Sequence, residues 1–224
     1  MTVADRRRRE REARRNHLLD AAEHVFLERG YDEVTVDDIA AEAEVAKGTL
    51  YLYFKNKHDL LMDLLHRRRR PILQAFGEAQ ADAKNGLDLV GRLIRAQQTS
   101  LAGDPSEFRR LFLRHLVEGP PHEMTPAFEN HAKHIERIIN TYLNAIERGQ
   151  GDGSIRTDLD PMMITTQIWG GVIGSLVLAQ HSDRIAARFG RPIDKDEYAE
   201  SLVELILRSI QAEKATGSPA EEEA

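Results

Sequence analysis

The chain has 224 residues, no cysteine and a formal net charge of −6. This length allows a sizeable core without metal or disulfide help, and the absence of cysteine excludes disulfides, cysteine-ligated zinc and a thiol nucleophile. The negative average argues against a protein that coats nucleic acid all over, but residues 1–70 hold 15 Lys and Arg against 14 Asp and Glu, whereas the remainder holds 16 against 23. The two parts are therefore expected to face different partners.

The N-terminus, MTVADRRRRERE, is highly charged and lacks the apolar core of a signal peptide. We therefore expect a cytoplasmic protein. The arginines from Arg6 to Arg15 predict a basic arm over residues 1–15 that lies along a phosphate chain or in a minor groove. A solvated, partly disordered face is the alternative interpretation, because blocks of like charge repel one another.

Apolar residues recur at helical spacing from Leu18 to Phe26, and Gly30 is placed to end that helix as a left-handed cap. Thr35 begins the pattern T-x-x-D and predicts the N-cap of a second helix over residues 36–43. A third helix is expected over 47–54, and a fourth opens at Asn56 or Lys57 and runs toward Arg70.

After Pro71 the predicted helices lie near residues 86–102, 106–118, 123–149, 160–187 and 194–213. The sequence thus predicts an all-α fold of about nine helices, without strands. Residues 162–179 are the most apolar stretch, but Gln167 and three glycines interrupt them, and the length favours a buried helix over a membrane span. The acidic tail, residues 214–224, is expected to be disordered.

The second and third predicted helices, joined by the turn Glu44-Val45-Ala46, describe a helix-turn-helix unit whose second helix can enter a major groove. At about 100° per residue, Leu50 and Phe54 fall on one side of that helix, with Lys47 and Tyr51 at its flank. Gly48, Thr49, Leu52 and Tyr53 point elsewhere, and this mixture of backbone access, hydroxyl, apolar group and phenol suits a DNA groove.

Alternative interpretations stay open for each of these features. Aromatic residues on a short helix usually belong to the core, and helix-turn-helix geometry also occurs in proteins that never touch DNA. Lys57, near the start of the fourth predicted helix, adds a positive charge where a helix N-terminus attracts phosphate. Only the combination favours DNA binding.

The stretch LLDAAEHVFLERGYDEVTVDDIAAEAEVAKGTLYLYFKNKHDLLMDLL, roughly residues 18 to 65, resembles the N-terminal domain of TetR-family transcriptional regulators. The resemblance implies that Lys47, Gly48, Thr49 and Tyr51 approach bases. It also implies that Thr35, Tyr53 and Lys57 contact phosphates.

Three positions depart from the family pattern. Many members have glycine where this chain has Glu44, and serine where it has Ala46, so the turn lacks an easy left-handed residue and a good N-cap. Asp37 stands where the tetracycline-responsive prototype has an arginine that contacts a base. We therefore expect this chain to read a different operator.

The resemblance implies a DNA-binding domain over 16–65 and a divergent ligand-binding and dimerisation domain over 66–213. It also implies a homodimer, whose last two helices from each chain form a four-helix bundle and whose two recognition helices meet a pseudo-palindromic, double-stranded operator. Residues 160–181, with Gly170, Gly171 and Gly174, and the stripe Leu202, Leu205, Ile206 and Ile210 suit that interface. Completion of a monomeric core is the alternative.

Aromatic and apolar residues at helical spacing predict a cavity for a small, lipophilic effector. The candidates are Phe108, Phe112, His115, Met124, Phe128, Ile139, Tyr142, Trp169 and Ile173. Each of them taken singly is more often a core residue than a ligand contact.

His131 and His134 lie one helical turn apart, with His115 and His122 upstream, but a solvated or hydrogen-bonded pair is favoured over a metal site. No nucleophile motif or phosphate loop is present, so we expect neither catalysis nor a cofactor. The sequence favours a ligand-responsive regulator, with a repressor as the expected form and no membrane partner. A helical enzyme and a protein-docking dimer are the rival functions.

Overall fold

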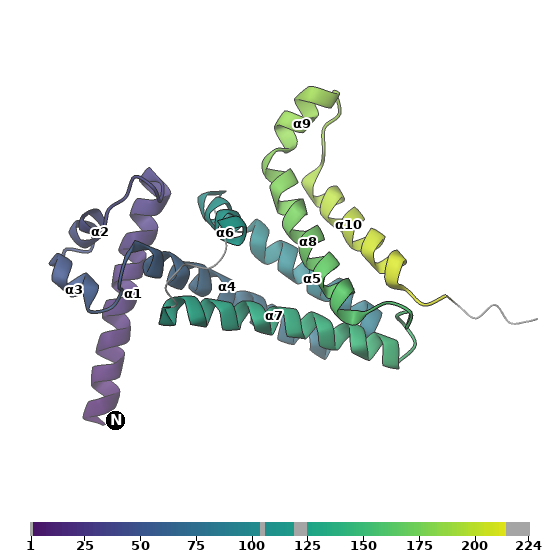
Figure 1. Ribbon diagram of the computed structural model, residues 1–224, viewed down its shortest axis with the longest axis horizontal. Helices are drawn as coiled ribbons and strands as arrows, with labels where there is room; N and C mark the ends of the chain where they lie inside the picture. Colours follow the sequence, from purple (N-terminus) through teal and green to yellow (C-terminus); the bar gives the residue numbers. More distant parts are fainter. Residues whose placement is uncertain (1, 104–105, 119–124, 214–224) are drawn as a thin grey trace, which may run out of the picture. The chain divides into compact units, whose positions relative to one another are not determined.

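The computed structural model describes residues 2–103, 106–118 and 125–213 and confirms the all-α class (Figure 1). Within these ranges the backbone forms ten helices and no strand. They are α1 (Val3–Arg29), α2 (Val36–Glu42), α3 (Lys47–Tyr51), α4 (Lys57–Ala81), α5 (Gly86–Ala102), α6 (Ser106–Glu118), α7 (Pro126–Gly151), α8 (Pro161–Gln180), α9 (Ser182–Phe189) and α10 (Lys195–Ile210). Met124, His122 and the acidic tail, which carried predictions, lie outside the described residues.

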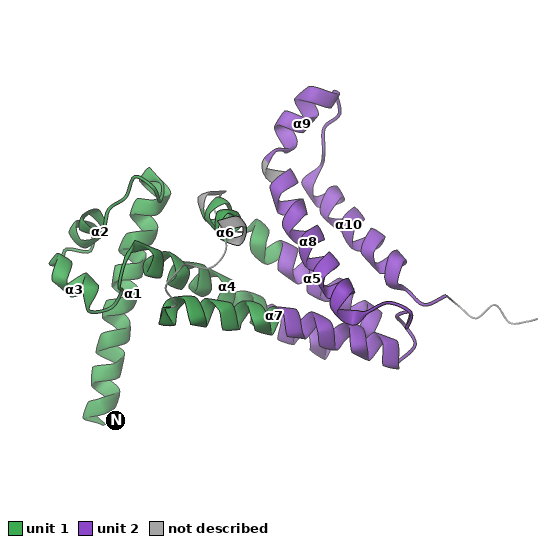
Figure 2. Cartoon of the chain, viewed as in Figure 1, with its two compact units in different colours: residues 1–74, 99–138 green, residues 75–98, 139–224 purple. Residues whose placement is uncertain are grey.

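The chain divides into two compact units, coloured separately in Figure 2. The first unit comprises Met1–Gln74 and Thr99–Ile138, and the second comprises Ala75–Gln98 and Ile139–Ala224. The first unit therefore contains α1 to α3, α6 and parts of α4, α5 and α7. This division is one of compactness, and the functional boundaries at residues 15, 65 and 213 remain predictions.

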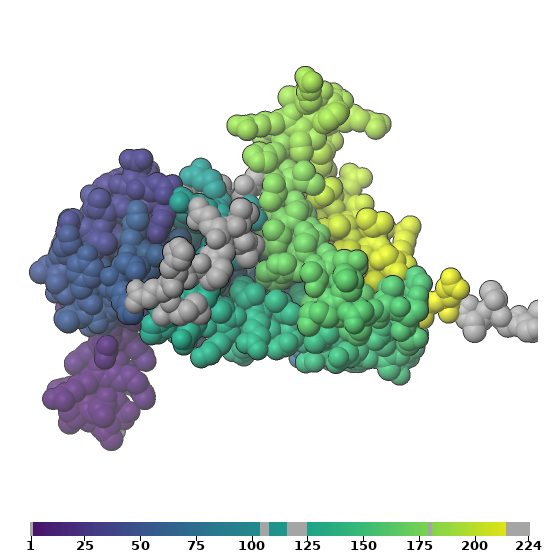
Figure 3. Space-filling view, viewed as in Figure 1, coloured from purple at the N-terminus to yellow at the C-terminus, as the bar shows by residue number. Residues whose placement is uncertain are grey.

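Helix α1 begins much earlier than its apolar spacing indicates. Thr2 and Asp5 form a capping box, in which the Thr2 hydroxyl accepts from the Asp5 backbone and the Asp5 side chain accepts from the Thr2 backbone. The arginine run is consequently helical, and the first turns of α1 project from the rest of the first unit (Figure 3). Gly30 ends α1 with φ +82° and ψ 149°, so its φ is positive but the predicted left-handed helical cap is wrong.

Helix α4 does not end near Arg70 as predicted. It continues through Pro71 to Ala81. Proline removes one backbone donor and crowds the preceding turn, which usually stops or bends a helix. Here apolar residues on both sides of the proline, such as Leu65 before it and Ile72 after it, are buried, and this packing carries the helix past it.

The second unit shows that the predicted helix 160–187 is two helices. His181 ends α8 and precedes α9, which closes at Gly190 in the left-handed conformation with φ +68°. Helix α8 packs on α10, where a side chain at Gly171 would contact Leu202 and Ile206 at ordinary distances of 3.7 and 3.8 Å. Leu205 does not belong to the packed stripe, because it is largely exposed.

Helix α8 is less covered than expected for a buried helix. Residues Pro161–Leu178 are long and apolar enough to cross a membrane, with a mean hydropathy of 1.3, and only 33% of this stretch is buried within the chain. A Cβ atom built at Gly170 or at Gly174 would meet no atom within 4 Å. One face of α8 thus has no neighbour in the described part of the chain.

Candidate functional site

Helix α2, the first helix of the helix-turn-helix unit, has Thr35 as its N-cap, as predicted. The Thr35 hydroxyl accepts from the Asp38 backbone at 3.2 Å, and the Asp38 carboxylate accepts from the Thr35 backbone at 2.7 Å. The Thr35 hydroxyl also donates to the Asp38 carboxylate at 2.5 Å. This bond, the bond from the Thr35 backbone and Arg29 at 3.0 Å lower the pKa of Asp38 to about 2. Thr35 is exposed, so its hydroxyl lies at the surface of a fixed helix start.

The turn between α2 and α3 has the two defects that the sequence indicates. Glu44 adopts φ +52°, a left-handed conformation that disfavours side chains other than glycine. Ala46 stands at the N-cap of α3 without a side-chain hydrogen bond. The turn is held by backbone bonds instead, because Glu44 donates to Ala41 at 3.0 Å and Val45 donates to Ala40 at 2.9 Å.

Helix α3 separates a buried side from an open side. It spans Lys47–Tyr51 and stops three residues short of the prediction, but Leu50 is 0% exposed and Phe54 is 2% exposed. On the open side, Tyr51 is 49% exposed and Leu52 is 73% exposed. A Cβ atom at Gly48 would meet nothing within 4 Å, so no packing within the described chain requires glycine there. Thr49 is half-buried.

Lys47 is joined to Asp37 across the two short helices. The ammonium lies 2.8 Å from the Asp37 carboxylate, and this hydrogen bond raises the pKa of Lys47. Both side chains are exposed, so the pair adds little to folding stability. It does place a negative charge against the lysine predicted to approach bases.

Lys57 and Tyr53 are oriented by contacts within the protein. The Lys57 ammonium donates to the carbonyls of Tyr31 at 2.7 Å and Val34 at 2.8 Å, and it lies 4.3 Å from the centre of the Tyr31 ring. A phosphate would compete with these carbonyls for the ammonium. Tyr53 is half-buried, with the Arg11 guanidinium 5.9 Å from its ring centre.

Comparison with known proteins identifies relatives of the helix-turn-helix unit. Residues 18–64 match the family described as bacterial regulatory proteins, tetR family. The fatty acid metabolism regulator protein of Bacillus subtilis is 32% identical over 162 residues, which cover 69% of this chain and 77% of that protein. The chain belongs to the TetR family.

Two further similarities extend over most of this TetR-family chain. The transcriptional activator FasR of Mycolicibacterium smegmatis is 26% identical over 194 residues, covering 87% of this chain and 81% of FasR. The crystal structure of FadR from Bacillus subtilis in complex with stearoyl-CoA has the same fold, with a TM-score of 0.67 and 23% identity, covering 87% and 98% of the two chains. The protein is a ligand-responsive, DNA-binding transcriptional regulator.

The predicted effector residues of this TetR-family chain fall into both units. Phe108, Phe112 and Phe128 are buried in the first unit, and the half-buried ring of His115 lies 5.9 Å from Phe128, edge to face. The guanidinium of Arg69 lies 4.1 Å from the ring centre of Phe112. Part of the predicted set is therefore brought together around α6 and α7.

The other four predicted effector residues that the structure describes belong to the second unit, where Ile139 is half-buried on α7. Tyr142 is buried against Phe76, edge to face at 5.6 Å, and its hydroxyl donates to the Gln97 side chain at 2.8 Å. Burial raises the pKa of Tyr142. Trp169 and Ile173 are half-buried on α8. Tyr142 has the contacts of a core residue whose hydroxyl is satisfied.

Of the two states expected for the histidine pair of this TetR-family chain, solvated or hydrogen-bonded, the structure excludes solvation, and His134 forms a hydrogen bond to the backbone of Arg69. His131 and His134 are 2% and 3% exposed, and burial is the largest cause that lowers their pKa values to about 3 and about 4. No group of three potential metal ligands occurs among the described residues. Arg69 is also buried, and the sequence did not predict a role for it. The only local indication was the concentration of positive and titratable side chains in His66–Arg70.

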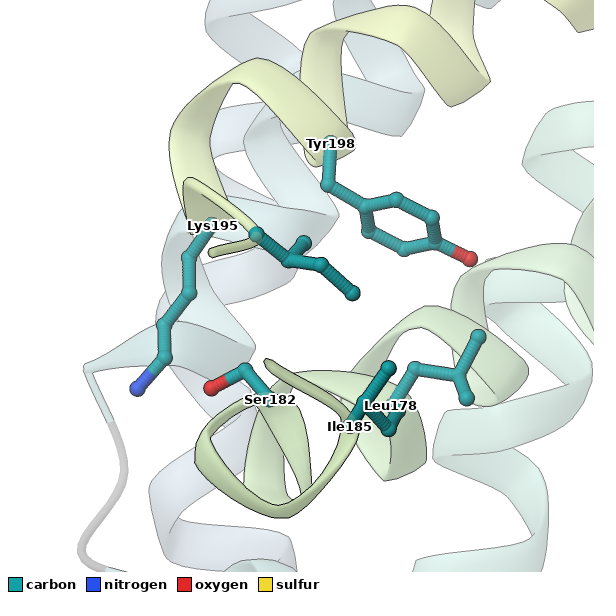
Figure 4. Close-up of a pocket in the computed structure, with 6 residues that line it drawn as sticks. Leu178, Ser182, Ile185, Lys195 and Tyr198 are labelled. Atoms are coloured by element: carbon teal, nitrogen blue, oxygen red, sulfur yellow. The ribbon is translucent and has the colours of Figure 1, made fainter. Parts of the chain in front are cut away.

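A small apolar cavity of about 190 Å³ lies in the second unit, around the junction of α8, α9 and α10 (Figure 4). Leu178, Ile185 and Tyr198 line it, and the Lys195 ammonium points away from these three side chains. Ligand sites for drug-sized molecules occupy roughly 300–1,000 Å³. This cavity is smaller and contains none of the predicted effector residues.

Proposed function

We propose that this TetR-family protein is a homodimeric repressor that leaves a pseudo-palindromic operator when a lipophilic effector binds. The observation that carries the proposal is the division of α3 into a packed side, with Leu50 and Phe54, and an open side, with Gly48 and Tyr51. A helix with this division can insert one face into a major groove without loss of its own core contacts.

The proposed DNA contacts follow from where the side chains lie. Lys47, Gly48, Thr49 and Tyr51 would meet base edges, whereas Thr35 and Tyr53 would meet phosphates. Lys57 would contribute its positive charge and the N-terminus of α4, since its ammonium already donates to three backbone carbonyls. The helical arginines of α1 would add sequence-independent attraction.

A two-fold dimer is supported by the uncovered face of α8. Gly170 and Gly174 have open space where a side chain would be, and Met163, Leu178 and Leu205 expose large apolar surfaces. Exposed apolar surface of this kind marks interaction sites, and symmetric homodimers are the commonest assemblies of soluble proteins. On this view the uncovered face of α8 meets a partner chain in the cytoplasm rather than a membrane.

An effector with an acyl chain is supported by the relatives. A relative from Bacillus subtilis is a fatty acid metabolism regulator, and FadR from Bacillus subtilis was crystallised with stearoyl-CoA. The buried phenylalanines of α6 and α7 supply apolar walls for such a chain. The effector would act by binding the DNA-incompetent arrangement more tightly than the competent one, which shifts the population away from the operator.

The test is selection of bound DNA from a random pool, followed by footprinting. The expected result is a site with two-fold symmetry whose affinity falls by roughly a thousandfold or more between 50 and 200 mM salt. The Tyr51→Ala variant should lose this binding while it keeps its helical content. Recovery of random sequences only would favour the protein-docking function, and an asymmetric site would contradict the dimer.

A further inference from the structure

Consecutive arginines on α4 point in different directions. Arg67 and Arg68 both pair with Glu23 on α1, and Arg67 also pairs with Asp20 at 2.6 Å. Because Arg69 follows Arg67 by two residues, it is rotated by about 200° from it and lies on the other side of the helix. It is turned inward instead, is 2% exposed and lies over the ring of Phe112.

Histidines from three helices surround this inward side. His66 of α4 meets His134 of α7 edge to face at 5.2 Å, and His115 of α6 meets His131 of α7 at 5.5 Å. Both α7 rings are more than nine-tenths buried. We call Arg69, His66, His115, His131 and His134 the imidazole cluster.

The imidazole cluster contains polar atoms whose hydrogen bonds are not made. Nδ1 of His66, Nδ1 of His131 and Nε2 of His134 are buried and have no partner among the described residues. His134 hydrogen bonds to the backbone of Arg69, so its Nε2 carries the lone pair when the ring is neutral. Buried polar atoms of native proteins are normally paired, so three in one place point to a group that binds there.

The charge of the imidazole cluster decides which kind of group fits. The guanidinium of Arg69 is permanently positive and lies close enough to lower the pKa of both α7 histidines. A metal cation would be repelled by it, and no ligand set for a metal occurs in the described residues. An oxyanion would be attracted to the guanidinium and would accept from any imidazole N–H.

We propose that Arg69, His131 and His134 bind the oxyanion head group, carboxylate or phosphate, of the effector. The apolar part of the effector then packs on the phenylalanines of α6 and α7. The inference rests on the proposed function, because it names the head-group chemistry of the effector proposed there.

Binding is coupled to proton uptake. The groups that face the α7 rings are His66 and Arg69 from α4, His115 from α6 and Arg137 on α7. Their positive charges disfavour a proton on these rings, whereas the hydrogen bond from His134 to the Arg69 backbone favours one on His134. An arriving oxyanion reverses this balance. His134 then takes a proton from solvent on Nε2, and this nitrogen becomes a donor to the anion. The anion should therefore bind more tightly as the pH falls from 8 toward 6.

The experiment is calorimetric titration of the full chain with three ligands of equal chain length: decanoate, decyl phosphate and methyl decanoate. At least one of the two anions should bind about tenfold or more tightly than the uncharged ester. Titrations in two buffers of different ionisation enthalpy should show uptake of about one proton per anion and none for the ester. The stronger anion identifies the head group as carboxylate or phosphate.

His134→Gln supplies the matched variant, because glutamine can still donate to the Arg69 backbone but cannot take up a proton. It should abolish proton uptake and reduce the preference for anions by about tenfold, with ester affinity unchanged. His24→Gln, which changes an exposed histidine on α1, should behave as the wild type. Equal binding of anions and ester to the wild type would overturn the inference even if the variant failed to fold.

The outcomes separate this inference from the proposed function. Selective DNA binding without affinity for any of the three ligands would leave the regulator in place and reduce the imidazole cluster to a site for trapped water. Anion binding with proton uptake, in a chain that selects no DNA sequence, would support the cluster and contradict the repressor.

Discussion

The first unit holds two sets of polar side chains in opposite environments. Lys47 and Tyr51 on α3 are exposed around a small packed side, whereas His131 and His134 on α7 are enclosed by α4 and α6. An exposed group exchanges water for DNA at little cost to the fold, but an enclosed group is desolvated before any ligand arrives. Substitutions on the exposed side of α3 should thus change binding with little loss of stability, and those in the imidazole cluster should change stability and binding together.

Leu50 and Leu52, two positions apart, give the largest expected difference in stability between substitutions. Leu50→Ala removes a fully buried side chain and should lower the free energy of unfolding by about 2–5 kcal/mol. Leu52→Ala, at a site 73% exposed, should change it by no more than about 0.5 kcal/mol and yet weaken operator binding. Denaturant titration and DNA-binding assays measure the two quantities. Equal losses of stability would break the division of α3 into two sides.

The pH dependence of stability tests the enclosed set. Burial lowers the folded-state pKa of His131 to about 3 and of His134 to about 4, whereas both titrate near 6.5 when unfolded. As the pH falls from 6.5 toward 4, the unfolded chain binds protons that the folded chain does not, so stability is lost. Each histidine contributes at most about 1.4 kcal/mol per pH unit.

Denaturant titrations across this pH range measure the loss. The double variant His131→Asn/His134→Gln should show a shallower fall, and His24→Gln, which changes an exposed side chain on α1, should keep the wild-type slope. An unchanged slope in the double variant would show that the two rings are not held neutral by burial.

A substitution at Gly48 tests whether stability and operator binding can change in opposite directions on the exposed side of α3. Gly48→Ala meets no atom of the described chain and should raise stability by up to about 1 kcal/mol, because alanine favours helix. The added methyl should prevent close approach to DNA and weaken operator binding about tenfold or more, or roughly 1.4 kcal/mol. Gly77→Ala is the control, since it is also helical and open, and it should gain stability without losing affinity.

Asp37→Asn should give the smallest of these effects, a modest change in operator affinity. The substitution removes the carboxylate that holds Lys47, so operator affinity should rise about threefold, as expected for an exposed ion pair. Asp158→Asn, which breaks a similar exposed pair with Arg156 at 2.6 Å, should leave affinity unchanged. Weaker binding after Asp37→Asn would mean that the pair helps to orient Lys47 on DNA.

The helix-turn-helix unit was accessible to sequence reasoning because its signals are local. The Thr35 cap, the strained Glu44 and the alternation between Leu50 and its exposed neighbours each depend on residues within a few positions. Such patterns fix helix ends and faces without reference to the rest of the chain.

The errors arose where distant contacts decide the outcome. Pro71 indicated a break, but burial of residues on both sides keeps α4 continuous. The histidines of α7 have ordinary spacing, and only the rings of α4 and α6 that pack on them make them buried. The end of α8 at His181 carries neither glycine nor proline, so no local signal marked it.

The continuity of α4 has a mechanical consequence. Pro71 leaves the carbonyl four residues before it, that of Arg67, without the usual backbone donor, so the helix bends there at lower energy than elsewhere. Arg69 lies two residues from this weak point, and Lys57, at the other end of the same rigid segment, clasps the loop that leads into α2. A small change in curvature beside the buried guanidinium would therefore be transmitted as a rotation of the whole segment that carries Lys57.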